Sequence, residues 1–88
     1  MKIHGEFVLR DIVDEIVAVP VGETALQFHG MIMLNRASKI IWQCLQTETD
    51  LPTLVKAVTD AFDVSAQEAE ADILEFLSQL RAAQLLEE

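Results

Sequence analysis

The spacing of apolar residues along the chain changes once, near residue 35. Before this point, β-branched and aromatic residues form short runs, which is typical of strands. The pattern predicts strands over about 7–12, 15–21 and 30–34, the first two joined by a tight turn at Val13-Asp14. Because Pro20 has no N–H group, the second strand should end there or place that residue on an open edge. Residues 25–29 are expected to be a partly ordered connection.

After Asn35 the apolar residues recur at every third or fourth position, which indicates amphipathic helices. Helices are predicted over about 36–46, 51–62 and 66–82. Asn35 and Asp50 precede the first two helices as plausible N-caps, and Ser65 with Glu68 forms a capping-box pattern before the third. Leu85 and Leu86 are expected to fold back onto the core after the last helix ends.

This order of elements predicts an α+β fold, a winged helix-turn-helix-like domain in which a three-stranded antiparallel sheet is followed by three helices. The 88 residues correspond to a single domain, residues 1–88. A domain of this size buries only about 60% of the surface of its unfolded chain. It therefore leaves little room for a deep active site.

The balance of charge weighs against binding to nucleic acid. Six Lys and Arg residues stand against fifteen Asp and Glu residues, for a net charge of −9. In a winged-helix DNA-binding regulator, the alternative that this fold suggests, the third helix would enter the groove of DNA. That helix carries several carboxylates and only Arg81 as a cation, so phosphates would repel it. We expect no nucleic-acid partner.

Side chains that could perform catalysis or hold a cofactor are sparse. His4 and His29 lack partners at metal-ligand spacing, and Cys44 falls on the apolar face of the first helix, where a buried inert thiol is expected. Ser65 superficially resembles the serine of a phosphopantetheine carrier protein, but an Asp-Ser-Leu motif is absent. The sequence therefore predicts no enzyme, no metal and no cofactor. With no long apolar run and no membrane partner, a cytoplasmic protein is expected.

Peptide binding is the remaining class of function. The predicted strand over 30–34 is short, and a strand at the edge of a sheet can accept another strand through its unpaired main-chain groups. If the third helix leans over this edge, a groove forms whose acidic rim favours a ligand bearing Lys or Arg. Met31 and Met33 would lie on one face, as adaptable contacts or as part of the core. Proline at Ile32 should impair binding if the N–H of that residue faces the peptide.

Several segments in this order resemble PqqD-like proteins, from about Phe7 to Leu86. The resemblance is carried by Phe7-Val8-Leu9-Arg10-Asp11-Ile12, Glu15-Ile16-Val17-Ala18-Val19-Pro20-Val21-Gly22, Gly30-Met31-Ile32-Met33-Leu34-Asn35, Ile40-Ile41-Trp42-Gln43-Cys44-Leu45, Phe62-Asp63-Val64-Ser65 and Ala69-Glu70-Ala71-Asp72-Ile73-Leu74-Glu75-Phe76-Leu77. The chain departs from the family at Val13-Asp14, where Ala-Gly is frequent, and at Ala83-Gln84, where a glycine is common.

The resemblance implies a RiPP recognition element, a non-catalytic domain that binds the leader segment of a ribosomally synthesised precursor peptide. In this family the leader adds as a strand beside the third strand and under the third helix. The implied partners are the leader and a separate maturation enzyme, either a lasso-peptide leader protease or a radical-SAM enzyme. The sequence leaves monomer and homodimer open. The implied peptide-binding residues are Met31, Ile32, Met33, Leu34, Asp72, Ile73, Phe76, Gln79 and Leu80.

Overall fold

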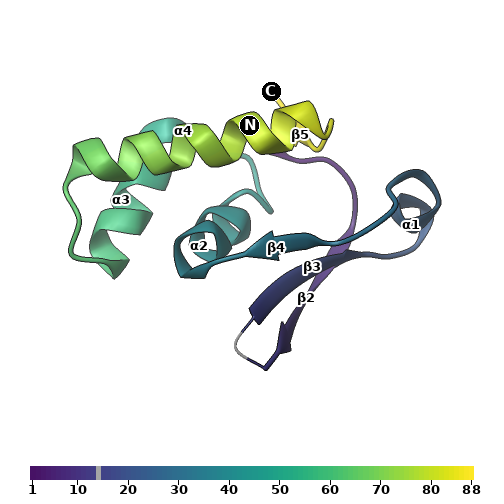
Figure 1. The fold of residues 1–88 in the computed structure, drawn as a ribbon. Coiled ribbons are helices and arrows are strands. Elements are labelled where there is room, and N and C mark those ends of the chain that lie inside the picture. Colours follow the sequence, from purple (N-terminus) through teal and green to yellow (C-terminus); the bar gives the residue numbers. More distant parts are fainter. Residues whose placement is uncertain (14) are drawn as a thin grey trace.

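In the computed structural model, which describes residues 1–13 and 15–88, a layer of helices covers one face of a small twisted sheet (Figure 1). The elements are β1 (Lys2–Ile3), β2 (Phe7–Ile12), β3 (Glu15–Pro20), α1 (Glu23–Gln27), β4 (Ile32–Leu34), α2 (Arg36–Cys44), α3 (Leu51–Ala61), α4 (Ala66–Ala82) and β5 (Leu86–Glu87). The sheet has the order β2-β3-β4 with antiparallel pairing throughout, and β1 pairs with β5. The α+β, winged-helix-like fold predicted from the sequence is confirmed.

Side chains that cap the helices explain where α2, α3 and α4 begin. In each case an oxygen of the N-cap side chain accepts a hydrogen bond from an N–H three residues later, at 2.8, 3.0 and 3.1 Å; the pairs are Asn35 with Ser38, Asp50 with Thr53 and Ser65 with Glu68. The hydrogen bonds from Thr53 lower the pKa of the Asp50 carboxyl. The reciprocal capping box occurs at Asn35 and Ser38, whereas Ser65 and Glu68 form only the first of its two bonds.

The core lies between the sheet and the helices. Trp42 of α2 is 2% exposed and meets the ring of Phe7 edge-to-face, with ring centroids 5.2 Å apart. The remaining fully buried side chains with the largest volumes are Ile41, Leu45, Leu54, Ile73 and Leu80. These residues come from the apolar stripes of the three helices, so the helical periodicity of the sequence corresponds to the packed faces.

The structure corrects several predicted boundaries. Strand β4 begins at Ile32, so Met31 precedes the strand, and β3 and helices α2 and α3 end one or two residues earlier than predicted. A five-residue helix, α1, occupies part of the connection that was expected to be partly ordered. It buries no residue, and therefore produces no apolar period in the sequence. Of the predicted turn, Val13 has a φ of 53° and Asp14 lies outside the described residues.

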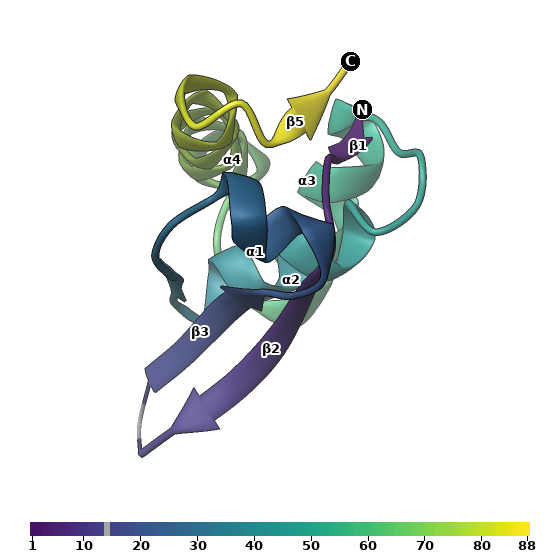
Figure 2. The same cartoon turned by 90° about the vertical axis from the view of Figure 1, so that its right-hand side faces the viewer.

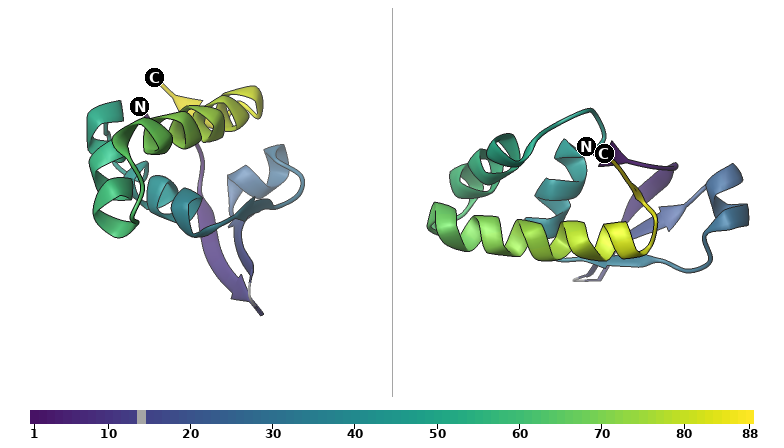
Figure 3. Two further views of the ribbon diagram at one scale, coloured as in Figure 1. Left: turned by 60° about the vertical axis from the view of Figure 1, so that its left-hand side comes forward. Right: turned by 90° about the horizontal axis from the view of Figure 1, so that it is seen from above.

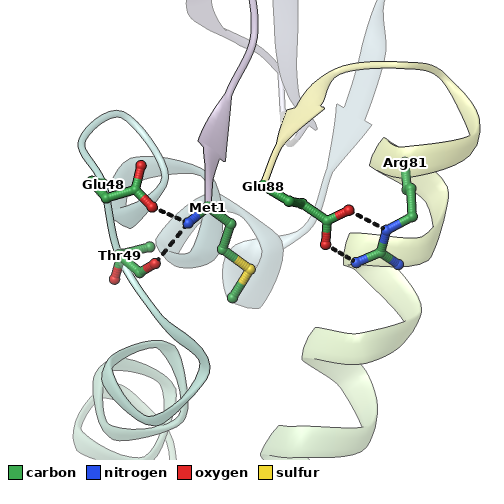
Figure 4. Close-up of polar contacts among 5 residues, drawn as sticks. All are labelled: Met1, Glu48, Thr49, Arg81 and Glu88. Carbon is green, nitrogen blue, oxygen red and sulfur yellow. Dashed lines mark hydrogen bonds and ion pairs between the residues drawn. The ribbon is translucent and has the colours of Figure 1, made fainter.

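The two ends of the chain lie side by side, away from the tip of the β2–β3 hairpin (Figure 2). Lys2 and Ile3 pair with Glu87 and Leu86, which joins β1 to β5. The Met1 ammonium contacts the Glu48 carboxylate and donates to the Thr49 carbonyl at 3.0 Å (Figure 4). Leu85, as expected, folds back and is 4% exposed.

Gln84 has a φ of 62°, in the left-handed region that favours glycine, just after the C-cap of α4. Replacement by glycine is expected to raise the free energy of unfolding by about 1 kcal/mol, because it removes the steric conflict between Cβ and the backbone. Urea denaturation followed by circular dichroism measures the change. The matched control Gln84→Ala keeps a Cβ atom and should leave the stability unchanged; an equal gain in both variants would contradict this explanation.

Candidate functional site

The register of the sheet determines which main-chain groups of β4 point to its free edge. The N–H of Val21 donates to the carbonyl of Glu6 at 3.0 Å, and these residues lie opposite each other in the continued register of β2 and β3. Hydrogen-bonded and non-bonded pairs alternate along an antiparallel ladder. Odd-numbered residues of β3 therefore bond to β2, and Ile16 and Ala18 direct their main-chain groups toward β4.

Met33 is consequently the residue of β4 whose N–H and C=O point away from the sheet. Its neighbours Ile32 and Leu34 lie opposite Ala18 and Ile16, so their main-chain groups bond to β3. Met33 itself lies opposite Val17, a position at which the pair exchanges no hydrogen bond. The edge of β4 therefore offers one donor and one acceptor at Met33, and the N–H of Ile32 does not face a ligand.

Asn35 closes one end of this edge. Its N–H donates to the Ser38 hydroxyl at 2.8 Å, and its carbonyl accepts from the N–H of Lys39 at 2.9 Å. Both main-chain groups are therefore engaged in the start of α2 and are not available to an added strand.

Helix α4 runs above β4 in the view of Figure 1, and α2 begins just beyond the end of that strand (Figures 1 and 3). A cavity of about 270 Å³ opens between these three elements. It is lined by Met33, Asn35, Ala37, Ser38, Ile41, Asp72, Glu75, Phe76 and Gln79. We call the cavity together with the free edge at Met33 the β4–α4 groove. Its position agrees with the groove expected from the sequence.

Some of the predicted site residues line the cavity and others do not. Met33, Asp72, Phe76 and Gln79 line the cavity. Met31, 58% exposed, precedes the strand, and Ile32 is half-buried against the core. The side chains of Leu34, Ile73 and Leu80 are at most 7% exposed and belong to the core. These three side chains do not line the cavity.

Five residues of the cavity were not among the predicted ones: Asn35, Ala37, Ser38, Ile41 and Glu75. Glu75 lies three positions after Asp72 and so occupies the same helix face, a signal that the sequence did contain. The four residues from Asn35 to Ile41 belong to the first turns of α2. The sequence explains Asn35 as an N-cap and Ala37 and Ile41 as part of an apolar stripe. Only the packing of α2 in the folded protein places them at the groove together with Ser38.

The charges that face the groove are negative. Asp72 and Glu75 have no cation within 4.0 Å among the described residues. The only cation of α4, Arg81, donates to both oxygens of Glu88 at 3.0 and 2.7 Å (Figure 4). These hydrogen bonds lower the pKa of the Glu88 carboxyl and raise that of Arg81. Arg81 is thus held at the C-terminal end of the chain, and it does not line the cavity.

The residues considered for metal binding or catalysis do not converge. His4 Nδ1 lies 3.3 Å from a carboxylate oxygen of Glu87, His29 is exposed, and Cys44 is a half-buried free thiol. No group of three or more potential metal ligands occurs in residues 1–13 and 15–88. Within the same residues, no helix combines the length and the apolar character needed to cross a bilayer.

These features define a winged-helix-like domain with an open strand edge beside a helix. The chain belongs to the PqqD family, because the family model for coenzyme PQQ synthesis protein D matches residues 16–86. The resemblance inferred from the sequence is thereby confirmed. Among solved structures, the chain is similar to one described as TbiB1 in complex with the TbiA(beta) leader peptide. The two share 26% identity and a TM-score of 0.72 over 99% of this chain and 95% of that chain. None of the curated proteins matches the chain.

Proposed function

We propose that this protein is a RiPP recognition element, which binds the leader segment of a ribosomally synthesised precursor peptide in the β4–α4 groove. The leader adds to the sheet as a strand along the edge of β4. It exchanges main-chain hydrogen bonds with Met33, and alternate side chains enter the cavity under α4. Membership of the PqqD family and the likeness to a leader-peptide complex support this proposal.

The observation that carries the proposal is the unpaired N–H and C=O of Met33 at the mouth of the cavity. Unpaired main-chain groups on an edge strand accept another strand. The cavity beside them supplies the side-chain pocket that strand addition needs for specificity. The same combination does not occur at β2, the other edge of the sheet, since none of its residues lines this cavity.

The bound leader is delivered to a separate maturation enzyme, which performs the chemistry in the cytoplasm. A leader protease of the lasso-peptide type or a radical-SAM enzyme fits this role. The protein itself contributes no catalytic group. It accelerates the reaction by holding the substrate at a high effective concentration beside the enzyme, with the two partners on different surfaces.

The alternative function, a winged-helix DNA-binding regulator, needs a cationic recognition helix. In α4 the carboxylates Glu70, Asp72 and Glu75 are exposed, and Arg81 is paired with Glu88. Phosphates would meet a negative surface along the whole helix. The charge distribution of the folded protein therefore disfavours this alternative, as it did in the sequence.

The test is an NMR titration of the labelled protein with the leader segment of a short precursor encoded beside this gene. We expect amide shifts concentrated at 31–34 and 72–80, and a dissociation constant between about 1 µM and tens of nanomolar, because a disordered peptide loses chain entropy on docking. Strand addition should weaken only modestly with salt, whereas binding to DNA would fall steeply.

Two controls make the titration decisive. A scrambled leader of the same composition should shift no amide in the groove. This control separates sequence-specific recognition of the leader from electrostatic attraction to a protein of net charge −9. A sizing column reports whether the protein is a monomer or a homodimer, and hence whether self-pairing of β4 edges occupies the groove. If the groove is free and no amide moves at millimolar leader, the proposal fails.

A further inference from the structure

The lining of the β4–α4 groove also indicates the chemistry of the side chain that it binds; this step rests on the proposed function. Three apolar residues of the two helices line the cavity, Ala37, Ile41 and Phe76, and we call them its floor. Ile41 is 1% exposed and Phe76 is 8% exposed, and Ala37 lies beside them at the start of α2. This floor is suited to an aliphatic or aromatic stem and offers no charge.

The polar groups of the cavity that lie closest to α2 are already satisfied. The Asn35 and Ser38 side chains bond to each other at 2.9 Å, and each accepts the N–H of the other residue at 2.8 Å. Among the described residues, no buried polar side-chain atom lacks a partner. A ligand therefore finds no orphaned neutral group to recognise at this end of the cavity.

The charged groups that line the cavity are the carboxylates of Asp72 and Glu75. Residues three apart are neighbours on a helix face, with Cβ atoms about 5–6 Å apart. Neither carboxylate is paired with a cation within the described residues. The cations of α2, Arg36 and Lys39, do not line the cavity, and Arg81 is engaged by Glu88. The rim of the cavity is thus doubly negative above an apolar floor.

An apolar floor with an anionic rim is complementary to a Lys or Arg side chain, which has an aliphatic stem and a cationic head. We infer that the recognised peptide carries a Lys or Arg whose stem packs on Phe76 and whose cation lies between the carboxylates of Asp72 and Glu75. An apolar residue would fill the floor but leave both carboxylates unpaired. An acidic residue would be repelled by them.

The pairing of the peptide with Met33 determines the position of this basic residue in the peptide sequence. The peptide residue that exchanges hydrogen bonds with Met33 has its side chain on the outer face of the sheet, as Met33 does. The residues immediately before and after it point to the opposite face, where Ile41 and Phe76 lie. The basic residue therefore occupies a position next to the partner of Met33.

The test is selection of a phage-displayed library of random linear peptides on the wild-type protein and on the double variant Asp72→Asn/Glu75→Gln. Peptides that also bind Met33→Pro are removed first, because that variant keeps every charge but lacks the N–H at the edge. We expect the wild-type peptides to share a Lys or Arg at one fixed position. We expect the double variant to lose this preference and to bind the wild-type peptides about three- to tenfold more weakly.

Glu70→Gln is the matched control, since Glu70 lies about 200° around the helix from Asp72 and does not line the cavity. It removes one negative charge from the same helix, outside the cavity, and should change neither the selected sequences nor their affinity. The inference would be overturned if the groove-binding peptides shared no position with Lys or Arg, or if the double variant still selected Lys or Arg at that position. Either result would leave leader binding intact. If no peptide distinguishes wild type from Met33→Pro, the proposed function falls together with the inference.

Discussion

Replacing Met33 by proline is expected to reduce affinity for the leader at least about tenfold while the domain stays folded. The substitution removes the N–H that faces the free edge and puts a ring where the peptide backbone would lie. The fold tolerates it because this N–H makes no bond within the sheet, and proline is accepted on such edge positions. Isothermal titration with the leader measures the affinity, and circular dichroism measures the fold.

Two neighbouring variants isolate the main-chain effect. Met33→Ala keeps the N–H and removes only the side chain, so its affinity should remain within about threefold of wild type. Ile32→Pro removes an N–H that is directed at Ala18, and is therefore expected to destabilise the sheet itself. If Met33→Pro were folded and bound the leader with wild-type affinity, strand addition along β4 would be excluded.

Replacing Trp42 by alanine is expected to lower the free energy of unfolding by about 3–5 kcal/mol. Trp42 is 2% exposed, and its ring packs edge-to-face against Phe7. The loss is a large fraction of the total stability, which is about 5–15 kcal/mol for a domain. Urea denaturation followed by far-ultraviolet circular dichroism is the measurement, because Trp42 is the only tryptophan in the chain and its fluorescence is lost with it.

Leu74→Ala is the control for this large effect. Leu74 is 48% exposed on α4, so truncation there should cost less than about 1 kcal/mol. If the two variants were equally stable, the core between β2 and α2 would not be packed as described.

The helices could be predicted from the sequence because their signals are local. An apolar residue at every third or fourth position defines the buried face, and Asn35, Asp50 and Ser65 mark the starts of the helices with hydrogen bonds that span only three residues. The missed elements lack such signals. Helix α1 buries nothing, and β1 and β5 contain two residues each and pair across nearly the whole chain.

The groove was predictable in outline and not in detail. The short strand and the acidic third helix are visible in the sequence, so Met33, Asp72, Phe76 and Gln79 could be named. The direction of each main-chain group depends on the register between β3 and β4, which no local pattern specifies. That is why Ile32 and Met33 were equivalent in the sequence, and why the structure assigns the free edge to Met33.

The capping box at Asn35 ends the free edge of β4, because the N–H and C=O of Asn35 are already bonded to Ser38 and Lys39. A strand bound beside Met33 can shift along this edge only by two residues at a time, because a shift of one turns every cavity-facing side chain to solvent. Each permitted step is about 6.6–6.8 Å. In the proposed binding mode, the distance from the bound leader segment to the residue presented for modification would therefore change only in discrete increments.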